Sequence, residues 1–202
     1  MSADRICSLF REVSRSLESA ASSDYPASVE AAIVLLITAF ETGHKLLVFG
    51  NGGSAADAEH ICAELVGRFL VERPGVPAIC LSSNAAVLTA WANDYSYEDV
   101  FVRQIQALGT AGDVAWAIST SGNSKNVVAG LAAARASGLR TIGMTGASGG
   151  RLAPFSDVLL AAPARETPRI QELHVVTYHA ICAAVEERVK LPLTASLNEF
   201  VR

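Results

Sequence analysis

The first 42 residues carry apolar side chains at the spacing of two successive helices. The first stripe is made of Ile6, Leu9, Phe10, Val13 and Leu17, and the second of Val29, Ile33, Leu36, Ile37 and Phe40. A polar stretch at residues 22–26 separates the stripes, and Gly43 ends the second. We therefore expect two helices, Ser2–Ala20 and Ala27–Thr42, arranged as a hairpin ahead of the main fold.

After residue 45 the pattern changes to short apolar runs that alternate with longer helical stretches. The expected strands are Leu46–Phe49, Ala78–Leu81, Val114–Ile118, Thr141–Met144 and Val158–Ala162. The expected helices are Ser54–Leu70, Ala85–Asn93, Tyr97–Leu108, Ser124–Ser137 and a last one from Pro168 to about Val189. Apolar runs without alternation indicate strands buried on both faces of a parallel sheet. The order predicts an α/β fold, a three-layer sandwich with a five-stranded parallel sheet.

The length of 202 residues predicts a single domain, because one domain takes about 150 residues. We assign residues 1–190 to this domain, including the N-terminal helical pair (residues 1–42), and treat residues 191–202 as a C-terminal tail. The tail gives no indication beyond a subunit contact or a disordered end.

Composition excludes several classes of protein. Half of the residues are hydrophobic and 18% are charged, which excludes global disorder. The longest apolar stretch, Ala31–Phe40, is half the roughly 20 residues that span a bilayer. A net charge of −4 without a basic cluster argues against bulk electrostatic binding of nucleic acid. Four dispersed cysteines without a CxxC motif are typical of a reducing cytoplasm.

Two polar loops follow predicted strands, where open α/β sheets bind their ligands. Residues 50–54 (Gly-Asn-Gly-Gly-Ser) come after the first strand and open a helix. Glycines let the backbone approach an anion, and the amides at a helix N-terminus attract negative charge. The loop is neither a Walker A motif nor GxGxxG, and it would equally suit a tight turn with Ser54 as the N-cap.

The second loop, residues 119–124 (Ser-Thr-Ser-Gly-Asn-Ser), follows the third strand. It gathers four hydroxyl groups at the beginning of a helix, on Ser119, Thr120, Ser121 and Ser124. One hydroxyl would be enough to cap the helix. Four favour a phosphate-binding loop that uses no lysine or arginine.

Candidate acid, base and metal-binding side chains lie on two predicted helices. Asp57, His60 and Glu64 share one helical stripe, and a His/Glu pair four residues apart can either bind a divalent metal or form a surface hydrogen bond. Gln171 and His179 on the last helix are about 80° apart around its axis, so they can converge on one site. Single histidines are more often structural, and we interpret His44 in that way.

Four segments together resemble the bacterial phosphoheptose isomerases, which are members of the sugar isomerase (SIS) domain superfamily. The segments are Asn51–His60, Asn93–Asp94, Ser119–Ser124 and Arg169–His174. The resemblance extends over nearly the whole chain up to about Lys190, including the helical pair. It implies conversion of sedoheptulose 7-phosphate to D-glycero-D-manno-heptose 7-phosphate, the first step toward nucleotide-activated heptose. It also implies a cytoplasmic homotetramer with active sites at subunit interfaces.

The resemblance also implies a set of site residues. The family's zinc ligands fall on His60, Glu64, Gln171 and His179. The family's substrate contacts fall on Gly52, Gly53, Ser54, Glu64, Asn93, Asp94, Ser119, Thr120, Ser121, Ser124 and Gln171.

Aldose–ketose isomerisation moves a proton between adjacent carbons through a cis-enediolate, so it needs an acid–base pair and an electrophile. Glu64 and His179 can serve as base and acid, and zinc would polarise the sugar oxygens. A glutamate bound to zinc is a poorer base, so Asp57 is a reserve candidate for proton transfer.

Two other functions are compatible with an SIS domain. Some SIS proteins of this length are adaptors that bind the bacterial replication initiator, but they lack the equivalents of Glu64 and His179, which this chain retains. Sugar-phosphate-sensing regulatory domains usually adjoin a DNA-binding segment, which the sequence does not contain. We therefore favour the enzyme.

Overall fold

A computed structural model describes residues 2–188 of the chain. Its centre is a five-stranded sheet in the order β2-β1-β3-β4-β5, and every neighbouring pair is parallel. The strands are β1 (Leu46–Gly50), β2 (Ala78–Cys80), β3 (Val114–Ile118), β4 (Arg140–Gly146) and β5 (Val158–Ala162). The predicted parallel sheet is confirmed, with strand ends shifted by at most two residues.

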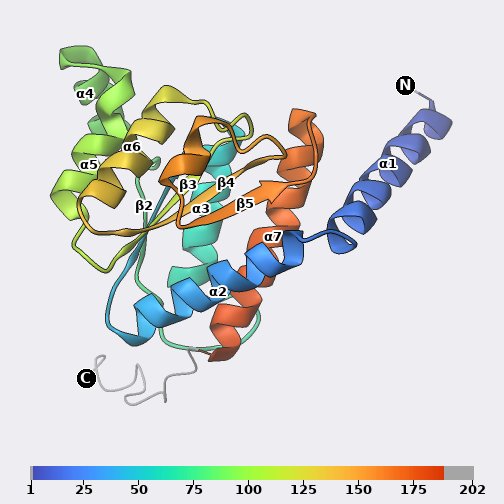
Figure 1. The fold of residues 1–202 in the computed structure, drawn as a ribbon, viewed down its shortest axis with the longest axis horizontal. Coiled ribbons are helices and arrows are strands. Elements are labelled where there is room, and N and C mark those ends of the chain that lie inside the picture. The colour runs from blue at the N-terminus through green and yellow to red at the C-terminus, as the bar shows by residue number, and fades with distance from the viewer. Residues whose placement is uncertain (1, 189–202) are drawn as a thin grey trace, which may run out of the picture.

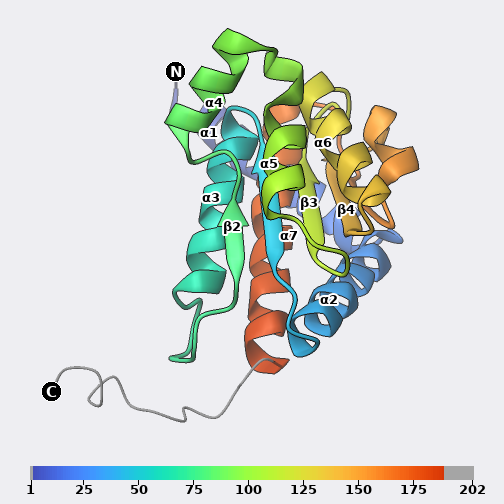
Figure 2. The same ribbon diagram turned by 90° about the vertical axis from the view of Figure 1, so that its left-hand side faces the viewer.

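Helices cover both faces of the sheet, as Figures 1 and 2 show. One face is covered by α2 (Tyr25–Glu41), α3 (Gly53–Val66) and α7 (Thr167–Arg188), and the other by α4 (Ala85–Asp94), α5 (Val100–Leu108) and α6 (Lys125–Ala136). Two short 3₁₀ helices, η1 (Tyr97–Asp99) and η2 (Gly150–Phe155), complete the second layer. Consecutive β1 residues enter different cores, because Leu46 packs under the first set of helices and Leu47 under the second. The expected three-layer sandwich is confirmed.

Burial of the strands on both faces holds for the middle of the sheet and not for its edges. All residues of β1 and β3 are buried, whereas β2 is half-exposed and Ile79 has 37% of its surface exposed. The expectation that β2 is buried on both faces is therefore wrong. As an edge strand of three residues, it has one neighbour and is only partly covered.

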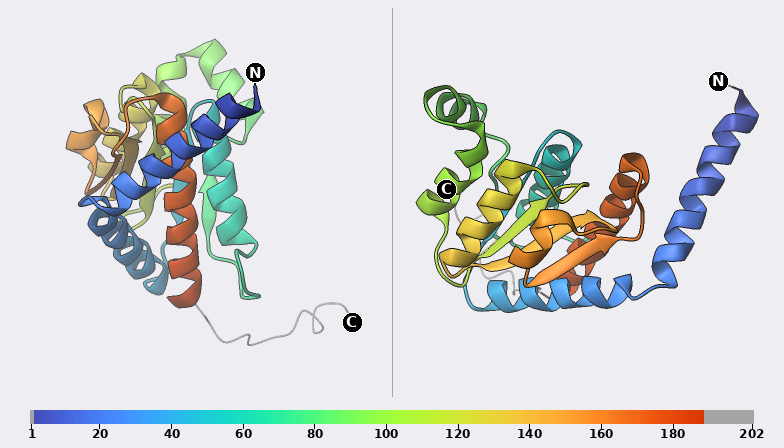
Figure 3. Two further views of the ribbon diagram at one scale, coloured as in Figure 1. Left: turned by 90° about the vertical axis from the view of Figure 1, so that its right-hand side faces the viewer. Right: turned by 45° about the horizontal axis from the view of Figure 1, so that its top comes forward.

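The first helix, α1 (Ala3–Ala21), extends away from the body of the molecule (Figure 3). It is bent by 71° relative to α2, so the helical pair is confirmed but its two members do not pack along their length as a hairpin. An ion pair of 2.8 Å between Arg169 and Glu12 fastens α1 to α7. Within residues 2–188, no single helix is long and apolar enough to cross a membrane; only α1 and α2 taken together, with the bend between them, pass that test.

The helix that opens with the glycine loop is shorter than expected. We predicted Ser54–Leu70, but α3 ends at Val66 and Gly67 follows as the C-cap. The backbone amides of Phe69, Leu70 and Val71 instead donate to the carboxylate of Glu186, at 2.7–3.0 Å. Because Glu186 of α7 accepts hydrogen bonds from these three amides, α3 can end at Val66 without leaving these backbone donors unpaired.

The division into one domain, residues 1–190, stays a prediction. The predicted tail, residues 191–202, lies outside the described residues.

Candidate active site

The two polar loops lie side by side at the carboxyl edge of the sheet. They follow β1 and β3, which are neighbours in the sheet. From β1 the chain continues through α3 on one face, and from β3 it continues through α6 on the other face. Where two neighbouring strands continue to opposite faces of an open α/β sheet, a crevice forms outside their carboxyl ends, and ligands usually bind there.

The glycine loop begins α3 without a side-chain cap. Its N-cap is Gly52, whose φ of +56° lies in the left-handed region that favours glycine. The alternative in which Ser54 is the N-cap is therefore wrong. Ser54 is instead a buried residue of the first turn. A Cβ added at Gly53 would collide with Nε2 of Gln171, so this glycine lets α7 approach α3 closely. The amide of Gln171 therefore lies directly against the loop.

Two hydroxyl groups of the second loop lie close together at the beginning of α6. The Oγ atoms of Ser119 and Ser124 lie 3.1 Å apart, and Ser121 Oγ accepts a hydrogen bond of 3.1 Å from the backbone amide of Asn123. Ser124 is the N-cap residue, but its side chain caps no backbone amide of α6. The backbone carbonyl of Thr120 accepts from Gly146, which fixes the loop to the end of β4.

A pair of asparagines joins the two loops. Asn51 Nδ2 donates to Asn126 Oδ1 at 2.8 Å, and Asn126 Nδ2 donates back to Asn51 Oδ1 at 2.9 Å. The hydroxyl of Tyr97 donates to the same Asn51 oxygen at 2.9 Å. Sequence analysis missed Asn126 and Tyr97, because their common partner Asn51 is more than forty residues away from each.

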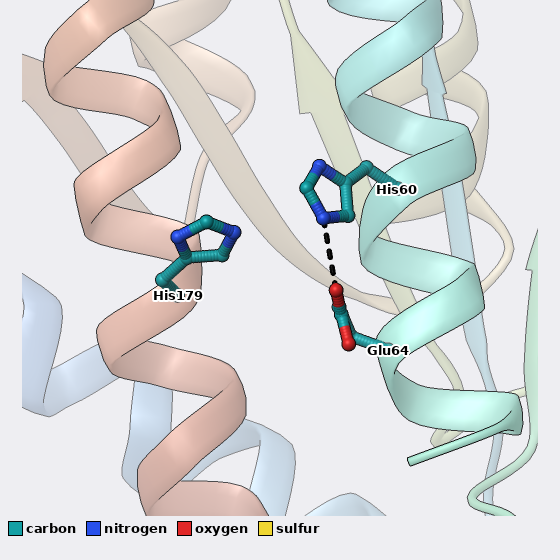
Figure 4. A group of neighbouring side chains, drawn as sticks. All are labelled: His60, Glu64 and His179. Atoms are coloured by element: carbon teal, nitrogen blue, oxygen red, sulfur yellow. Dashed lines mark hydrogen bonds and ion pairs between the residues drawn. The ribbon is translucent and has the colours of Figure 1, made fainter. Parts of the chain in front are cut away.

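Three side chains from the facing helices α3 and α7 form a candidate metal site (Figure 4). His60 Nε2 lies 2.9 Å from Glu64 Oε1, and the His179 ring lies 5.1 Å from the His60 ring. One ligand atom from each of the three residues lies within 4.8 Å of the others. Two imidazoles and a carboxylate are a donor set found in catalytic sites for divalent zinc, in which one position stays open. The residues present therefore fit such an ion.

Two further residues adjoin this cluster. The hydroxyl of Tyr178 is 2.9 Å from His60 Nδ1. Burial raises the pKa of Asp57 to about 6, although the neighbouring His60 acts to lower it. Asp57 Oδ2 is buried and has no hydrogen-bond partner among residues 2–188. A carboxyl group with such a pKa can take up and release a proton near neutral pH.

Not every predicted site residue reaches the cluster. Gln171 lies against Gly53 at the beginning of α3, about two turns before His179 on α7. Asn93 and Asp94 end α4 on the opposite face of the sheet, where Asn93 Nδ2 donates to Asp94 Oδ1 at 2.9 Å. Both are exposed. No contact within the described part of the chain links them to His60, Glu64 or His179.

Comparisons with known proteins agree with this architecture. The sequence profile of the SIS domain family matches residues 9–146, a range that includes both loops and α3. A phosphoheptose isomerase from Synechocystis sp. is 49% identical over 175 residues, which are 87% of this chain and 90% of that protein. Solved structures of phosphoheptose isomerases from Neisseria gonorrhoeae and Francisella tularensis superpose with TM-scores of 0.85 and 0.88. They are 38% and 32% identical, cover 91% and 93% of this chain, and are themselves covered to 98% and 100%.

Proposed function

The chain belongs to the phosphoheptose isomerase family of SIS domain proteins, and we propose that it converts sedoheptulose 7-phosphate to D-glycero-D-manno-heptose 7-phosphate. This reaction would be the first step toward nucleotide-activated heptose, carried out in the cytoplasm. The observation that carries the proposal is the cluster of His60, Glu64 and His179. It is an acid–base group between two helices that both begin beside the glycine loop.

The chemistry requires one group to remove a proton from carbon and another to protonate the product side. In the proposed reaction the Glu64 carboxylate takes the carbon proton, and His179 on the opposite helix holds or supplies a proton at the sugar oxygens. Ligand atoms of the two residues lie within 4.8 Å of each other on the facing helices α3 and α7, so both groups can act on neighbouring atoms of one substrate (Figure 4). Developing negative charge on the enediolate is stabilised by donors fixed in advance.

We place the substrate phosphate at the Ser119–Ser124 loop. The hydroxyls of Ser119, Thr120, Ser121 and Ser124 gather there at the N-terminus of α6, a twelve-residue helix whose free backbone amides favour an anion. The glycine loop, Gly52–Ser54, lies on the neighbouring strand and would hold the sugar together with Gln171.

The metal in this proposal is zinc, one ion per subunit, held by His60, Glu64 and His179. Gln171, the fourth ligand of the family pattern, lies against Gly53 in this structure and would have to turn toward the ion to bind it. When bound, zinc polarises the oxygens on C1 and C2 of the sugar as a Lewis acid. A ligand role makes Glu64 a weaker base. Asp57, one turn earlier on α3 and with its raised pKa, is then suited to the proton transfers of ring opening.

We further propose that the enzyme is a homotetramer with active sites at subunit interfaces. Asn93 and Asp94 support this arrangement, since they are exposed and lie on the other face of the sheet from the cluster. In an assembly these two residues can contact the substrate of another subunit.

The decisive experiment is to incubate the purified protein with sedoheptulose 7-phosphate, with and without a chelator, and to detect the aldoheptose phosphate. We expect product only in the metal-replete reaction, with activity restored by added zinc. A protein inactive on every heptulose phosphate, with or without zinc, would instead favour the adaptor that binds the replication initiator.

A further inference from the structure

Tyr178 lies in the contact between α3 and α7, next to both histidines of the candidate metal site. Its ring meets the rings of His60 and His179 edge to face, at centroid distances of 5.2 and 4.9 Å. Only 1% of its surface is exposed, and its hydroxyl is 2.9 Å from His60 Nδ1. The hydroxyl therefore contacts the one nitrogen of His60 that does not face Glu64.

The direction of this hydrogen bond depends on what His60 Nε2 binds. In the structure Nε2 faces the Glu64 carboxylate, which can only accept, so a neutral His60 carries its proton on Nε2 and Tyr178 donates to Nδ1. A histidine that binds a metal through Nε2 must carry its proton on Nδ1, and that N–H needs an acceptor. A phenol hydroxyl can both donate and accept.

We propose that Tyr178 is a positioning residue for the metal, whose hydroxyl holds the His60 ring in place in both tautomers and accepts from Nδ1 when Nε2 binds a cation. The proposal rests on the proposed metal-dependent function. The proton lost from Nε2 is balanced by one that Nδ1 gains from water, so the ring stays neutral and the phenol keeps its own proton. Replacing this hydroxyl leaves the metal-binding tautomer with an unsatisfied donor.

The Tyr178 phenol keeps its own proton whichever tautomer His60 adopts. Burial raises the pKa of Tyr178 to about 12, and the charge of Asp57 acts in the same direction. Asp57 Oδ2 is buried and unpartnered within residues 2–188. No hydrogen bond within that range joins this oxygen to the Tyr178 hydroxyl, whose side-chain partner is His60.

A second tyrosine provides a matched control. The hydroxyl of Tyr25 in α2 forms a hydrogen bond of 3.0 Å with Thr177 Oγ1. Thr177 directly precedes Tyr178 on α7. Burial raises the pKa of Tyr25 to about 12, and the bond to Thr177 acts against this rise. Tyr25→Phe removes one hydrogen bond to α7, and Tyr178→Phe removes one hydrogen bond to α3. Of the two tyrosines, only Tyr178 contacts a proposed metal ligand.

The test measures zinc affinity of the metal-free full chain by competition with a chromophoric chelator. We expect Tyr178→Phe to bind zinc about 10–100-fold more weakly than the wild type, and Tyr25→Phe to bind it as tightly as the wild type. Thermal unfolding of the metal-free variants checks that both are folded. Unchanged affinity in Tyr178→Phe, or an equal loss in both variants, overturns the positioning role while leaving the proposed isomerase intact.

A measurement on the wild type covers the case in which Tyr178→Phe does not fold. In the zinc-loaded protein with ¹⁵N-labelled histidine, NMR should find the proton of His60 on Nδ1; a proton-free Nδ1 overturns the proposal. A wild type that binds no zinc overturns both the metal in the proposed function and this inference.

Discussion

Histidines of the same helix have different roles because their surroundings differ. His174 and His179 are about 140° apart around α7, so they face different neighbours. His174 is fully buried and contacts the carbonyl of Thr145, and burial lowers its pKa to about 4, although that contact acts to raise it. His179 is only partly buried and faces His60 across the gap to α3. Residue type alone could not separate a neutral core histidine from a candidate acid.

The role of His179 can be tested by His179→Asn. Asparagine is polar and close in size, so the fold should survive, but a positioned proton donor is worth about 10²–10⁴-fold in rate. We expect turnover of sedoheptulose 7-phosphate to fall by that factor while binding of a sugar phosphate persists. His44→Asn, at the opposite edge of the sheet beside Asp113, is the control and should keep its rate. An active His179→Asn enzyme would remove this residue from the mechanism.

The phosphate site can be tested with Ser121→Ala and Ser124→Ala. Each change removes a hydroxyl that would donate to a charged acceptor, at about 1.5–3 kcal/mol. Steady-state kinetics should show the loss mainly in KM, because the phosphate is bound alike in the ground state and the transition state. Ser8→Ala on the exposed side of α1 serves as the control. An unchanged KM with a collapsed kcat would place the phosphate elsewhere.

The contacts of Asp113 predict how the free energy of unfolding should depend on pH. Burial alone would raise the pKa of its carboxyl, but hydrogen bonds from Lys45 and Thr110 outweigh burial and lower the pKa to about 2. A lowered pKa stabilises the folded state above the unfolded value of about 3.9, and this stabilisation is lost as the pH falls toward 2. Urea unfolding should therefore show Asp113→Asn less stable than wild type at pH 6, with the difference shrinking between pH 4 and 2. A stability difference for Asp113→Asn that stays constant with pH would contradict the assignment.

At the scale of elements, a buried ion pair fixes the spacing of the two helices that carry the site. Arg73 and Glu186 are 3.2 Å apart with side chains only 2% and 3% exposed. The Arg73 guanidinium also donates to the carbonyls of Glu64 and Leu65 at the end of α3. Glu186 binds the amide of Phe69, whose ring lies 5.5 Å from that of His179. The pair therefore ties the end of α3 to α7 beside the candidate metal site.

Glu186→Gln should be strongly destabilising, because it leaves the Arg73 charge buried without a counter-charge. Breaking a buried pair in this way costs about 3–5 kcal/mol, which chemical denaturation can measure. Glu187→Gln is the matched control, since the neighbouring side chain is exposed and should change stability little. Equal stabilities of the two variants would show that the pair contributes nothing to holding α3 and α7 together.

The elements were predictable where the information is local. Continuous apolar runs located the five strands, and helical stripes located α1 and α2, because burial of one or both faces imposes those patterns. Pro168 indicated the beginning of α7. The end of α3 was not predictable, since the partner of the amides at residues 69–71 is Glu186, 115 or more residues later in the chain. The joining of the two loops by Asn51 and Asn126 likewise depends on strand order. The cluster itself was anticipated in part from helical spacing and in part from the family resemblance.

At the scale of the molecule, α1 offers an unpartnered apolar side. Ile6, Leu9 and Phe10 expose 41%, 37% and 71% of their surface on a helix that stands away from the body (Figure 3). We expect a tetramer in light scattering at micromolar concentration, with α1 and α2 in the interface, because a free helix would not keep such a stripe in water. Phe10→Glu should lower the assembled mass, and Glu18→Gln should not. A monomeric wild type would contradict the expected assembly.

The position of α7 has a consequence for biosynthesis. This helix packs against α2 on one side and α3 on the other (Figure 2). The apolar surfaces of α2 and α3 that face it are synthesised earlier and stay exposed to solvent until α7 has been made. A nascent chain that stops before Thr167 already contains every strand, yet it leaves Leu36, Ile61 and Leu65 without their covering helix. Such an intermediate is prone to aggregation and is the kind of client that ribosome-bound chaperones protect. Since His179 lies on the same helix, the cluster of His60, Glu64 and His179 forms only once α7 has packed against α3.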